Sequence, residues 1–382
     1  MGRVRILYVI DSLAPGGAER SLVSIAPHLM ERGIELRVAA VQDRDDLRDD
    51  LEHAGVEVVH LTPAGRPGRV RQLATLVRSI RPDLVHTTLF EADIAGRLAA
   101  AMERVPCVCT LANESYGMDY AGQPGVSAVR LRAAQAGDVA TARLVRRFHA
   151  VSEGVAATMT RRLLIPRRRI DVVHRGRDPE VLGRRTPGRT RAKRLALGVG
   201  AGPLVVAVAR HEYDKGLDVA IQAMARVRRL APDAVLVVAG RQGNQTGELE
   251  GLIREAGLGR SVRLLGPRDD VADLLAAADV FMAPSRREGL PGAVLEAMAL
   301  EAPIVASDLP AMREVLGDDG ACAHLVPIGS ADAFADAVVD AFGSAGSMAA
   351  RTSNGRRRFE QMFTVHRAAV GMVAFYERAL RP

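Results

Sequence analysis

Residues 4–33 read VRILYVIDSLAPGGAERSLVSIAPHLMERG, and this stretch decides the fold of the first half of the chain. Residues 4–10 are apolar apart from one arginine and include β-branched side chains, which is typical of a strand buried on both faces of a parallel sheet. A glycine-rich loop at 15–17 follows, and apolar residues then recur at helical spacing until Gly33 ends the pattern. The stretch therefore predicts a strand, a loop and a helix, the repeating unit of an α/β fold.

The same alternation continues through both halves of the chain. Further strand-like runs occur in the first half at 36–41, 56–61, 84–86 and 107–111. A second start at 203–209, PLVVAVA, enters a polar loop and a helix, and runs at 235–239, 262–265, 280–283, 304–306 and 324–327 follow. We therefore predict an α/β protein of two Rossmann-like, doubly wound parallel-sheet domains facing a cleft lined by the carboxyl ends of their strands.

One basic segment rich in Pro and Gly, GRRTPGRTRAKR, separates the two halves. It lacks apolar periodicity, which is typical of a linker, and a chain of 382 residues exceeds the ~250–300 at which a single core stops growing. We predict a first domain at 1–183, a linker at 184–194 and a second domain at 195–364. The apolar spacing after Arg356 predicts a C-terminal helix that reaches about 365–382.

Composition restricts the classes of protein and partner. Hydrophobic residues make up 48% and charged residues 25%, as in ordinary globular proteins. The net charge of +7 suits an anionic ligand, an acidic lipid surface or a nucleic acid, and Lys215 is one of only two lysines beside fifty arginines. Three cysteines without CxxC spacing argue against a disulfide framework and a zinc site. With no apolar run near ~18 residues, we expect a cytoplasmic protein, soluble or peripheral at the inner membrane surface.

The stretch PSRREGLPGAVLEA at 284–297 places two acidic residues around a predicted helix start. Pro291 suits a first helical position, and Gly289 and Gly292 allow a ligand to approach the backbone. The free N–H groups and positive dipole end of such a helix favour an anion such as a diphosphate. Glu296, inside the helix, can accept hydrogen bonds from two ribose hydroxyls. Glu288, before the helix, faces a part of the ligand that lies further out. The alternative is a capped surface helix with a solvated Glu296.

Two cations lie in the loop after the first strand of the second half. Arg210 ends that strand and Lys215 follows five residues later, so both can reach a diphosphate bound nearby. A solvated loop with paired surface charges is the alternative. Their combination with the two-glutamate stretch favours the ligand-binding interpretation.

At this point the sequence resembles a known family. ARHEYDKG at 209–216 and APSRREGLPGAVLEAMALEAPIVAS at 283–307 resemble the donor-binding half of retaining glycosyltransferase family 4, whose fold is GT-B. PGGAERSLVSIAPHLMERG at 15–33 and HAVSEGVAATM at 149–159 resemble its acceptor-binding half. The resemblance covers nearly the whole chain, and the second-half motifs are its specific part.

The resemblance implies a glycosyltransferase of hexosyltransferase type that moves a sugar from a nucleoside-diphosphate sugar, UDP being favoured, to an acceptor hydroxyl. The sugar nucleotide is a co-substrate, and neither a cofactor nor a metal is implied. Arg210 and Lys215 would hold the diphosphate, Glu296 the ribose and Glu288 the transferred sugar.

Further donor contacts are implied for two loops. Backbone groups of the run Gly289, Leu290, Pro291 and Gly292 would approach the phosphates and the sugar. Arg268 and Asp269, in GPRDDV at 266–271, would flank the base. In the family, the C-terminal helix also packs back on the first domain.

In the first half, Gly16 and Gly17 open a cleft-side loop where a bulky side chain would obstruct acceptor or donor phosphates, although a tight turn alone explains them. His86 ends a strand and is a catalytic candidate, with a hydrogen-bonded core histidine as the alternative. The family often has a second histidine two places later, where this chain has Thr88.

Acceptor contacts are less sharply marked. Asn113 and Glu114 stand where relatives commonly carry a histidine, and Arg175, where an asparagine is usual, suggests an acidic or phosphorylated acceptor. The acceptor is either a small molecule or lipid-linked. Residues 129–148 predict a basic helix, which either rests against an anionic membrane or is simply solvated.

Other functions remain as alternatives. A sugar-nucleotide epimerase or hydrolase can share the fold, and a non-catalytic basic protein can bind membrane or nucleic acid. Aromatic residues at 3% argue against nucleic acid, because single-strand binding needs stacking rings. The acidic runs at 43–50 and 269–273 are alternatives as metal ligands, but interleaved charges are typical of solvated faces, so we predict no metal.

Overall fold

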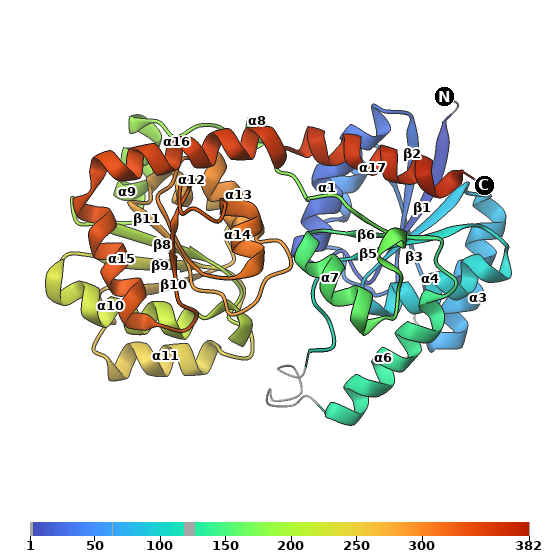
Figure 1. Ribbon diagram of the computed structural model, residues 1–382, viewed down its shortest axis with the longest axis horizontal. Helices are drawn as coiled ribbons and strands as arrows, with labels where there is room; N and C mark the ends of the chain where they lie inside the picture. The colour runs from blue at the N-terminus through green and yellow to red at the C-terminus, as the bar shows by residue number, and fades with distance from the viewer. Residues whose placement is uncertain (1–2, 63, 118–126, 382) are drawn as a thin grey trace. The chain divides into compact units, whose positions relative to one another are not determined.

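The computed structural model describes residues 3–62, 64–117 and 127–381 and divides the chain into two compact units. Unit 1 contains Met1–Gly176 and Val365–Pro382, and unit 2 contains Arg177–Thr364. The chain thus enters unit 2 before the predicted linker and leaves it just before the last helix. Each unit is an α/β domain with its own sheet (Figure 1).

Unit 1 is built on a parallel sheet that has seven strands within the described residues. Its order is β3-β2-β1-β4-β5-β6-β7, so the direction of winding reverses between β1 and β4, as in a doubly wound fold. The strands are β1 (Val4–Ile10), β2 (Ile34–Ala40), β3 (Glu57–His60), β4 (Leu84–Thr88), β5 (Cys107–Leu111), β6 (Arg147–Ala150) and β7 (Ile170–Val172).

Helices cover both faces of this sheet because β1 is apolar on both sides. Ile6 and Ile10 pack in the cluster that includes α1 and α17, whereas Leu7 and Val9 pack in the cluster that includes α3 and α4. The helices are α1 (Gly17–Met30), α2 (Arg48–His53), α3 (Arg66–Ile80), α4 (Phe90–Met102), α6 (Ala128–Ala142), α7 (Glu153–Arg162) and α17 (Val365–Leu380). The basic helix expected at 129–148 is shorter, because α6 ends at Ala142 and β6 begins at Arg147.

The C-terminal helix α17 belongs to unit 1 and packs against α1 (Figure 1). Its apolar stripe, which includes Met372, Phe375 and Tyr376, is buried in the core of that unit. The Tyr376 hydroxyl also lies 2.8 Å from Nδ1 of His86 in β4. The last residues of the chain therefore complete a core that the first residues begin.

Unit 2 repeats the arrangement with a parallel sheet of six strands among the residues that the structure describes. The order is β10-β9-β8-β11-β12-β13, and the winding reverses between β8 and β11. The strands are β8 (Leu204–Val208), β9 (Val235–Ala239), β10 (Val262–Gly266), β11 (Val280–Ala283), β12 (Ile304–Ser307) and β13 (His324–Val326).

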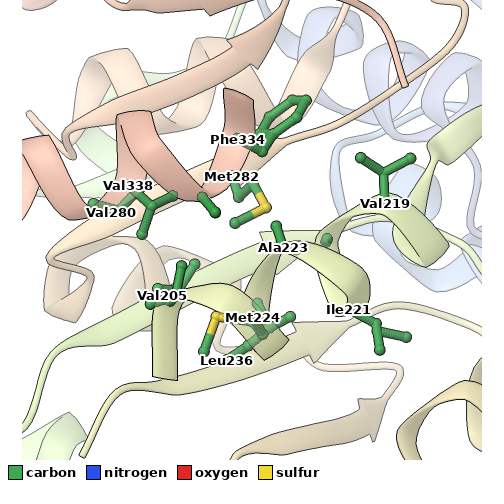
Figure 2. Packing of buried hydrophobic residues seen from close by; sticks show 14 of the residues in the cluster. Val205, Val219, Ile221, Ala223, Met224, Leu236, Val280, Met282, Phe334 and Val338 are labelled. Atoms are coloured by element: carbon green, nitrogen blue, oxygen red, sulfur yellow. The ribbon is translucent and has the colours of Figure 1, made fainter. Parts of the chain in front are cut away.

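The core on one face of this sheet lies between the strands and two helices, α10 and α15. Val205 and Leu236 from the strands meet Met224 of α10, and Phe334 and Val338 of α15 complete the same cluster (Figure 2). The helices of unit 2 are α8 (Pro179–Leu182), α9 (Pro187–Ala196), α10 (Leu217–Leu230), α11 (Thr246–Glu255), α12 (Val271–Ala277), α13 (Gly292–Ala299), α14 (Pro310–Leu316), α15 (Ala331–Gly343) and α16 (Ala345–Met362). Across 3–62, 64–117 and 127–381, no helix has the length and hydropathy needed to cross a bilayer.

The segment expected as a linker at 184–194 instead lies inside unit 2, where α9 occupies most of it. Thr186 caps this helix by accepting a 3.2 Å hydrogen bond from the amide of Arg189. Ion pairs then tie α9 to α12, with Arg189 Nε 2.6 Å from Asp273 and Lys193 Nζ 2.5 Å from Asp270. The basic residues that indicated a flexible connection are partners of acids that lie 77 and 84 residues further along the chain.

Candidate active site

A cavity of about 110 Å³ opens in unit 2 at the carboxyl ends of β8 and β11. The winding of the sheet reverses between these two strands, which is where ligands of doubly wound sheets bind. Its lining includes Lys215 from the loop after β8, Glu288 from the loop after β11, and Pro291 and Gly292 at the start of α13. Four residues selected from the sequence therefore meet at one place.

Lys215 and Glu288 form an ion pair at this cavity. Lys215 Nζ lies 2.7 Å from Oε1 of Glu288, and the Ser285 hydroxyl donates to the same oxygen at 2.8 Å. The two charged side chains are only 22% and 13% exposed, so water screens their interaction weakly. The pair fixes an ammonium group and a carboxylate side by side where a polar ligand can reach them.

The two loops that carry this pair touch through Gly216. This residue has a φ of +62°, and a Cβ on it would collide with the backbone oxygen of Pro284. A side chain at 216 is therefore excluded both by the left-handed backbone and by a rigid neighbour. The glycine of the KG pair thus brings Lys215 next to the loop of Glu288.

Two further ion pairs, which we call the arginine clasp, join the loop of Glu288 to the loop of Lys215 and to the first turn of α10. Arg286 donates to both carboxylate oxygens of Asp218 at 2.7 and 2.6 Å, and its guanidinium carbon lies 4.4 Å from the centre of the Tyr213 ring. Arg287 pairs with Asp214 at 2.6 Å. The bidentate and stacked geometry suits arginine rather than lysine. The clasp was not predicted, because opposite charges at 214, 218, 286 and 287 do not by themselves indicate that two distant segments meet.

Helix α13 begins at Gly292, with Pro291 as its N-cap residue, one place later than the sequence suggested. Gly292, Ala293 and Val294 line the cavity, so the amino end of the helix faces it. A helix amino end carries a partial positive charge and attracts anions. Leu290, also expected near the ligand, is buried and is 7% exposed.

Glu296 lies one turn inside α13 and is held by an arginine absent from our predicted site. Nε of Arg177 is 2.6 Å from Oε1 of Glu296, and the side chains are 14% and 20% exposed. The solvated Glu296 of the alternative interpretation is therefore not what the structure shows. Arg177 gave no distinct signal because it is one arginine among fifty.

The remaining predicted donor residues lie on loops at the same edge of the sheet but are more exposed. The Arg210 side chain is 53% exposed, and its guanidinium is 4.0 Å from Glu212. Arg268 donates to both oxygens of Asp270 at 2.8 and 2.6 Å, next to the exposed Asp269. The hydrogen bond from Arg268 holds the pKa of the Asp270 carboxyl below its usual range. These residues can contact a bound nucleotide only from exposed positions on the loops at this edge of the sheet.

In unit 1, the glycines of the first loop begin helix α1. Gly16 is the N-cap residue with extended backbone, and a Cβ on it would collide with the carboxylate of Glu19. A Cβ on Gly17 would make an ordinary contact with Arg175 Nη1 at 3.6 Å. A side chain at 16 would therefore have to displace the Glu19 carboxylate, and Arg175 lies beside the start of the helix.

His86 is buried in β4 and matches the core alternative. Its Nδ1 lies 2.8 Å from the Tyr376 hydroxyl, and its Nε2 lies 2.7 Å from the Thr110 hydroxyl. Burial, with a smaller contribution from nearby His149, holds the pKa of His86 well below its usual value. A neutral ring with both nitrogens occupied is poorly placed to take a proton from an acceptor, so His86 has no part in the mechanism proposed below.

Other first-half residues also have local partners. The Thr88 hydroxyl lies 2.7 Å from that of Tyr8, and Asn113 accepts a hydrogen bond from Ser115 at 2.6 Å. The backbone oxygen of Glu114 accepts from Arg162 at 2.7 Å. Unit 1 also contains a small cavity of about 50 Å³ between α1, α17 and the sheet, whose lining includes Arg175.

The acidic run at 43–50 forms a mixed cluster with a histidine. One ligand atom each from Asp43, Asp45 and His60 lies within 4.8 Å of the others. His60 Nε2 is 3.1 Å from Asp45, and Arg48 lies 3.7 Å from the same carboxylate. Neighbouring positive charge of this kind agrees with the solvated-face interpretation.

Two family models match the chain, one on each unit. "Glycosyltransferase Family 4" matches residues 15–181, and "Glycosyl transferases group 1" matches residues 202–343, so together they span most of the sequence. The chain belongs to glycosyltransferase family 4. The match over 202–343 includes both loops of the cavity, and the match over 15–181 includes the glycine loop of α1.

Curated relatives of this family 4 chain carry different transferase names. A lipopolysaccharide core biosynthesis mannosyltransferase of Rhizobium meliloti is 31% identical over 199 residues, which are 50% of this chain and 56% of the relative. The chain thus spans little more than half the length of that protein. A 2-deoxystreptamine N-acetyl-D-glucosaminyltransferase of Streptomyces fradiae is 28% identical over 356 residues, covering 86% of this chain and 83% of its own.

Solved structures establish the fold of the family 4 chain. Anabaena Alr3699/HepE in complex with UDP-glucose matches with a TM-score of 0.86 at 23% identity, covering 98% of this chain and all of the other. The chain therefore has the GT-B fold that the sequence predicted. Identity this low carries the architecture but not the ligand.

Proposed function

We propose that the protein transfers a sugar from a nucleoside-diphosphate sugar, with UDP as the favoured nucleotide, to an acceptor hydroxyl, with retention and without a metal. The observation that carries this proposal is the Lys215–Glu288 pair at the cavity beside the amino end of α13. A cation, a helix amino end and a carboxylate are the groups that a diphosphate and a sugar require together. The HepE structure contains UDP-glucose, so UDP is the first nucleotide that the proposal tests.

Each residue has a role set by the chemistry of the transfer. The bond from the anomeric carbon to the diphosphate oxygen breaks, a bond to the acceptor oxygen forms on the same face of the sugar, and the acceptor hydroxyl passes its proton to the leaving diphosphate oxygen. Negative charge develops on the leaving diphosphate, where Lys215, Arg210 and the amino end of α13 stabilise it without a metal. Glu288 contacts hydroxyls of the transferred sugar, and Glu296 accepts from the ribose.

The acceptor is proposed to contact unit 1, around Arg175 and the start of α1. A guanidinium there suits an acidic or phosphorylated group. The Streptomyces fradiae relative is named for 2-deoxystreptamine, and the Rhizobium relative for lipopolysaccharide core biosynthesis. Small and lipid-linked acceptors are therefore both included in the screen that follows.

Calorimetry with UDP and GDP tests the donor half of the proposal. We expect UDP to bind the purified protein with a micromolar dissociation constant, and absence of binding by either nucleotide at millimolar concentration would refute the transferase proposal. A UDP-release assay with a panel of acceptors then tests transfer. Rapid donor consumption without any acceptor would favour the alternative of an epimerase or hydrolase.

A groove on unit 1 supports a contact between the protein and an anionic membrane. It has a volume of about 530 Å³ between α6 and α7, and its lining includes Arg132, Arg143, Arg161, Arg162 and Leu164. Leu164 is 75% exposed, so an apolar side chain lies at the surface among the arginines of the groove. Each arginine near an anionic lipid surface contributes ~1 kcal/mol, so such a group can hold the protein at a membrane.

Sedimentation with lipid vesicles tests this contact. We expect binding to phosphatidylglycerol vesicles that falls with salt, and little binding to phosphatidylcholine vesicles. Exchange of Arg132, Arg143 and Arg161 to Gln should abolish it, whereas Arg226→Gln, at an exposed ion pair in unit 2, should not. Equal sedimentation of both variants would contradict the assignment of this surface.

A further inference from the structure

Arg177 is the first residue of unit 2, and its guanidinium lies at the amino end of α13. Its amide donates to the backbone oxygen of Phe363 at 2.9 Å and its backbone forms a bridge with Thr364, so the main chain is anchored. Nε donates to Oε1 of Glu296 at 2.6 Å. Nη2 lies against Gly292, where a Cβ would displace it. One side chain thus spans the first turn of the helix.

This position is electrostatically unusual. The amino end of a helix carries partial positive charge, so a cation there is disfavoured unless an anion accompanies it. Glu296 supplies one negative charge, and the pair is mostly removed from water, with side chains 14% and 20% exposed. The guanidinium lies against Gly292, which lines the cavity at the amino end of the helix, and a diphosphate would complement both positive groups.

We propose that Arg177 is a donor-binding residue that positions Glu296 for the ribose and presents its guanidinium to the diphosphate of the same nucleotide. This inference rests on the proposed function and deepens it. The ribose and the diphosphate of a nucleotide are joined by one ester linkage, so a residue in contact with both of their binding groups, Glu296 and the start of α13, lies at the junction.

The geometry favours arginine for both tasks. Nε and Nη2 point from one rigid plane to Glu296 and to Gly292, which a single ammonium cannot do. Because Arg177 occupies Oε1 of Glu296, the ribose hydroxyls would donate to the second carboxylate oxygen. The alternative is that Arg177 obstructs the phosphate site. If the guanidinium only fills space that the phosphates need, its removal strengthens nucleotide binding.

Nucleotide titrations of the full-length protein separate these roles. We expect Arg177→Gln to weaken UDP binding about tenfold or more, the loss of one charge-assisted hydrogen bond to phosphate. Uridine, measured by NMR because it binds weakly, should lose less. The wild-type preference for UDP over 2′-deoxy-UDP should shrink in Arg177→Gln and also in Arg177→Lys, because neither side chain can hold Glu296 in the same way.

Control variants distinguish a role of Arg177 in donor binding from a merely structural role. Arg185→Gln, which removes a guanidinium near the backbone oxygen of Glu301 in the same unit, should leave UDP affinity unchanged. A uniform loss for UDP, uridine and 2′-deoxy-UDP would show a merely structural role and overturn the inference, as would unchanged or tighter UDP binding. Should Arg177→Gln fail to fold, the same nucleotides are titrated against Arg177→Lys and against Arg177→Gln combined with Glu296→Gln, which removes the unpaired carboxylate. Wild-type protein that binds neither UDP nor GDP would instead refute the proposed function itself.

Discussion

Replacing Lys215 by alanine removes the ammonium that pairs with Glu288 at the cavity. If this cation stabilises the leaving diphosphate, its loss costs ~2.7–4 kcal/mol of transition-state stabilisation, by analogy with other preorganised groups that stabilise developing charge. The turnover number should then fall about 100- to 1,000-fold, and at least tenfold if the exposed Arg210 compensates in part. UDP affinity should fall as well, because the diphosphate loses a charge-assisted contact.

The same change also affects stability, and that effect must be separated from catalysis. Without Lys215, the Glu288 carboxylate keeps only the hydroxyl of Ser285 as a hydrogen-bond donor among the contacts described above, while 13% exposed. Leaving a buried charged group without its partner costs ~1–3 kcal/mol or more. The double variant with Glu288→Gln should recover part of that stability, because the unpaired charge is gone, but it should not recover turnover.

Donor turnover is measured as UDP release by purified variants, with UDP calorimetry and thermal unfolding on the same samples. Arg194→Ala is the matched control, since Arg194 forms a 2.7 Å ion pair with Asp279 and is 16% exposed, but at the opposite end of the strands. It should lose stability and keep UDP affinity. Near-normal turnover and UDP affinity in well-folded Lys215→Ala would refute the role assigned to this lysine.

Three further outcomes follow from the structure. Arg286→Ala opens the arginine clasp, so we expect a donor KM raised about tenfold and a Tm lowered by a few degrees; an unchanged KM measured by UDP release would contradict it. Burial raises the pKa of the Asp11 carboxyl from 3.8 to about 7. Its contribution to stability is therefore present below about pH 4 and is lost as pH rises through 7, so the unfolding free energy of the wild type relative to Asp11→Asn should fall between pH 5 and 8 in urea titrations. An equal difference at both pH values would show that Asp11 is not so perturbed. Finally, EDTA should leave donor turnover unchanged, and activity that disappears and returns with Mg²⁺ would contradict the metal-independent mechanism.

The fold was predictable because its signals are local. VRILYVI at 4–10 is apolar on both sides, and the structure places helices against both of its faces. The second apolar run followed by a polar loop, at 203–209, likewise predicted a second sheet. The segment 184–194 was different, because its arginines and lysine find their acidic partners on α12, far along the chain. No local pattern can distinguish such a helix from a flexible basic linker.

The candidate site was predictable to the extent that loop position decides it. Lys215 and Glu288 were selected from separate motifs, and their contact agrees with the expected meeting of loops at the switch point. Arg177 was missed because its meaning depends on Glu296, which is 119 residues away in sequence. His86 was similarly ambiguous until Tyr376, which is 290 residues away, supplied a partner for its ring.

Helix α17 has a consequence for how the protein is made. A ribosome synthesises unit 1 almost entirely first, then all of unit 2, and only then the residues that fill the remaining gap beside α1. Until those final turns emerge, the nascent amino-terminal half exposes apolar surface around Leu22, Ala26 and Leu29 to water and to chaperones. Premature termination near codon 364 should therefore yield a product in which the later-made unit is sound and the earlier-made one is left incomplete.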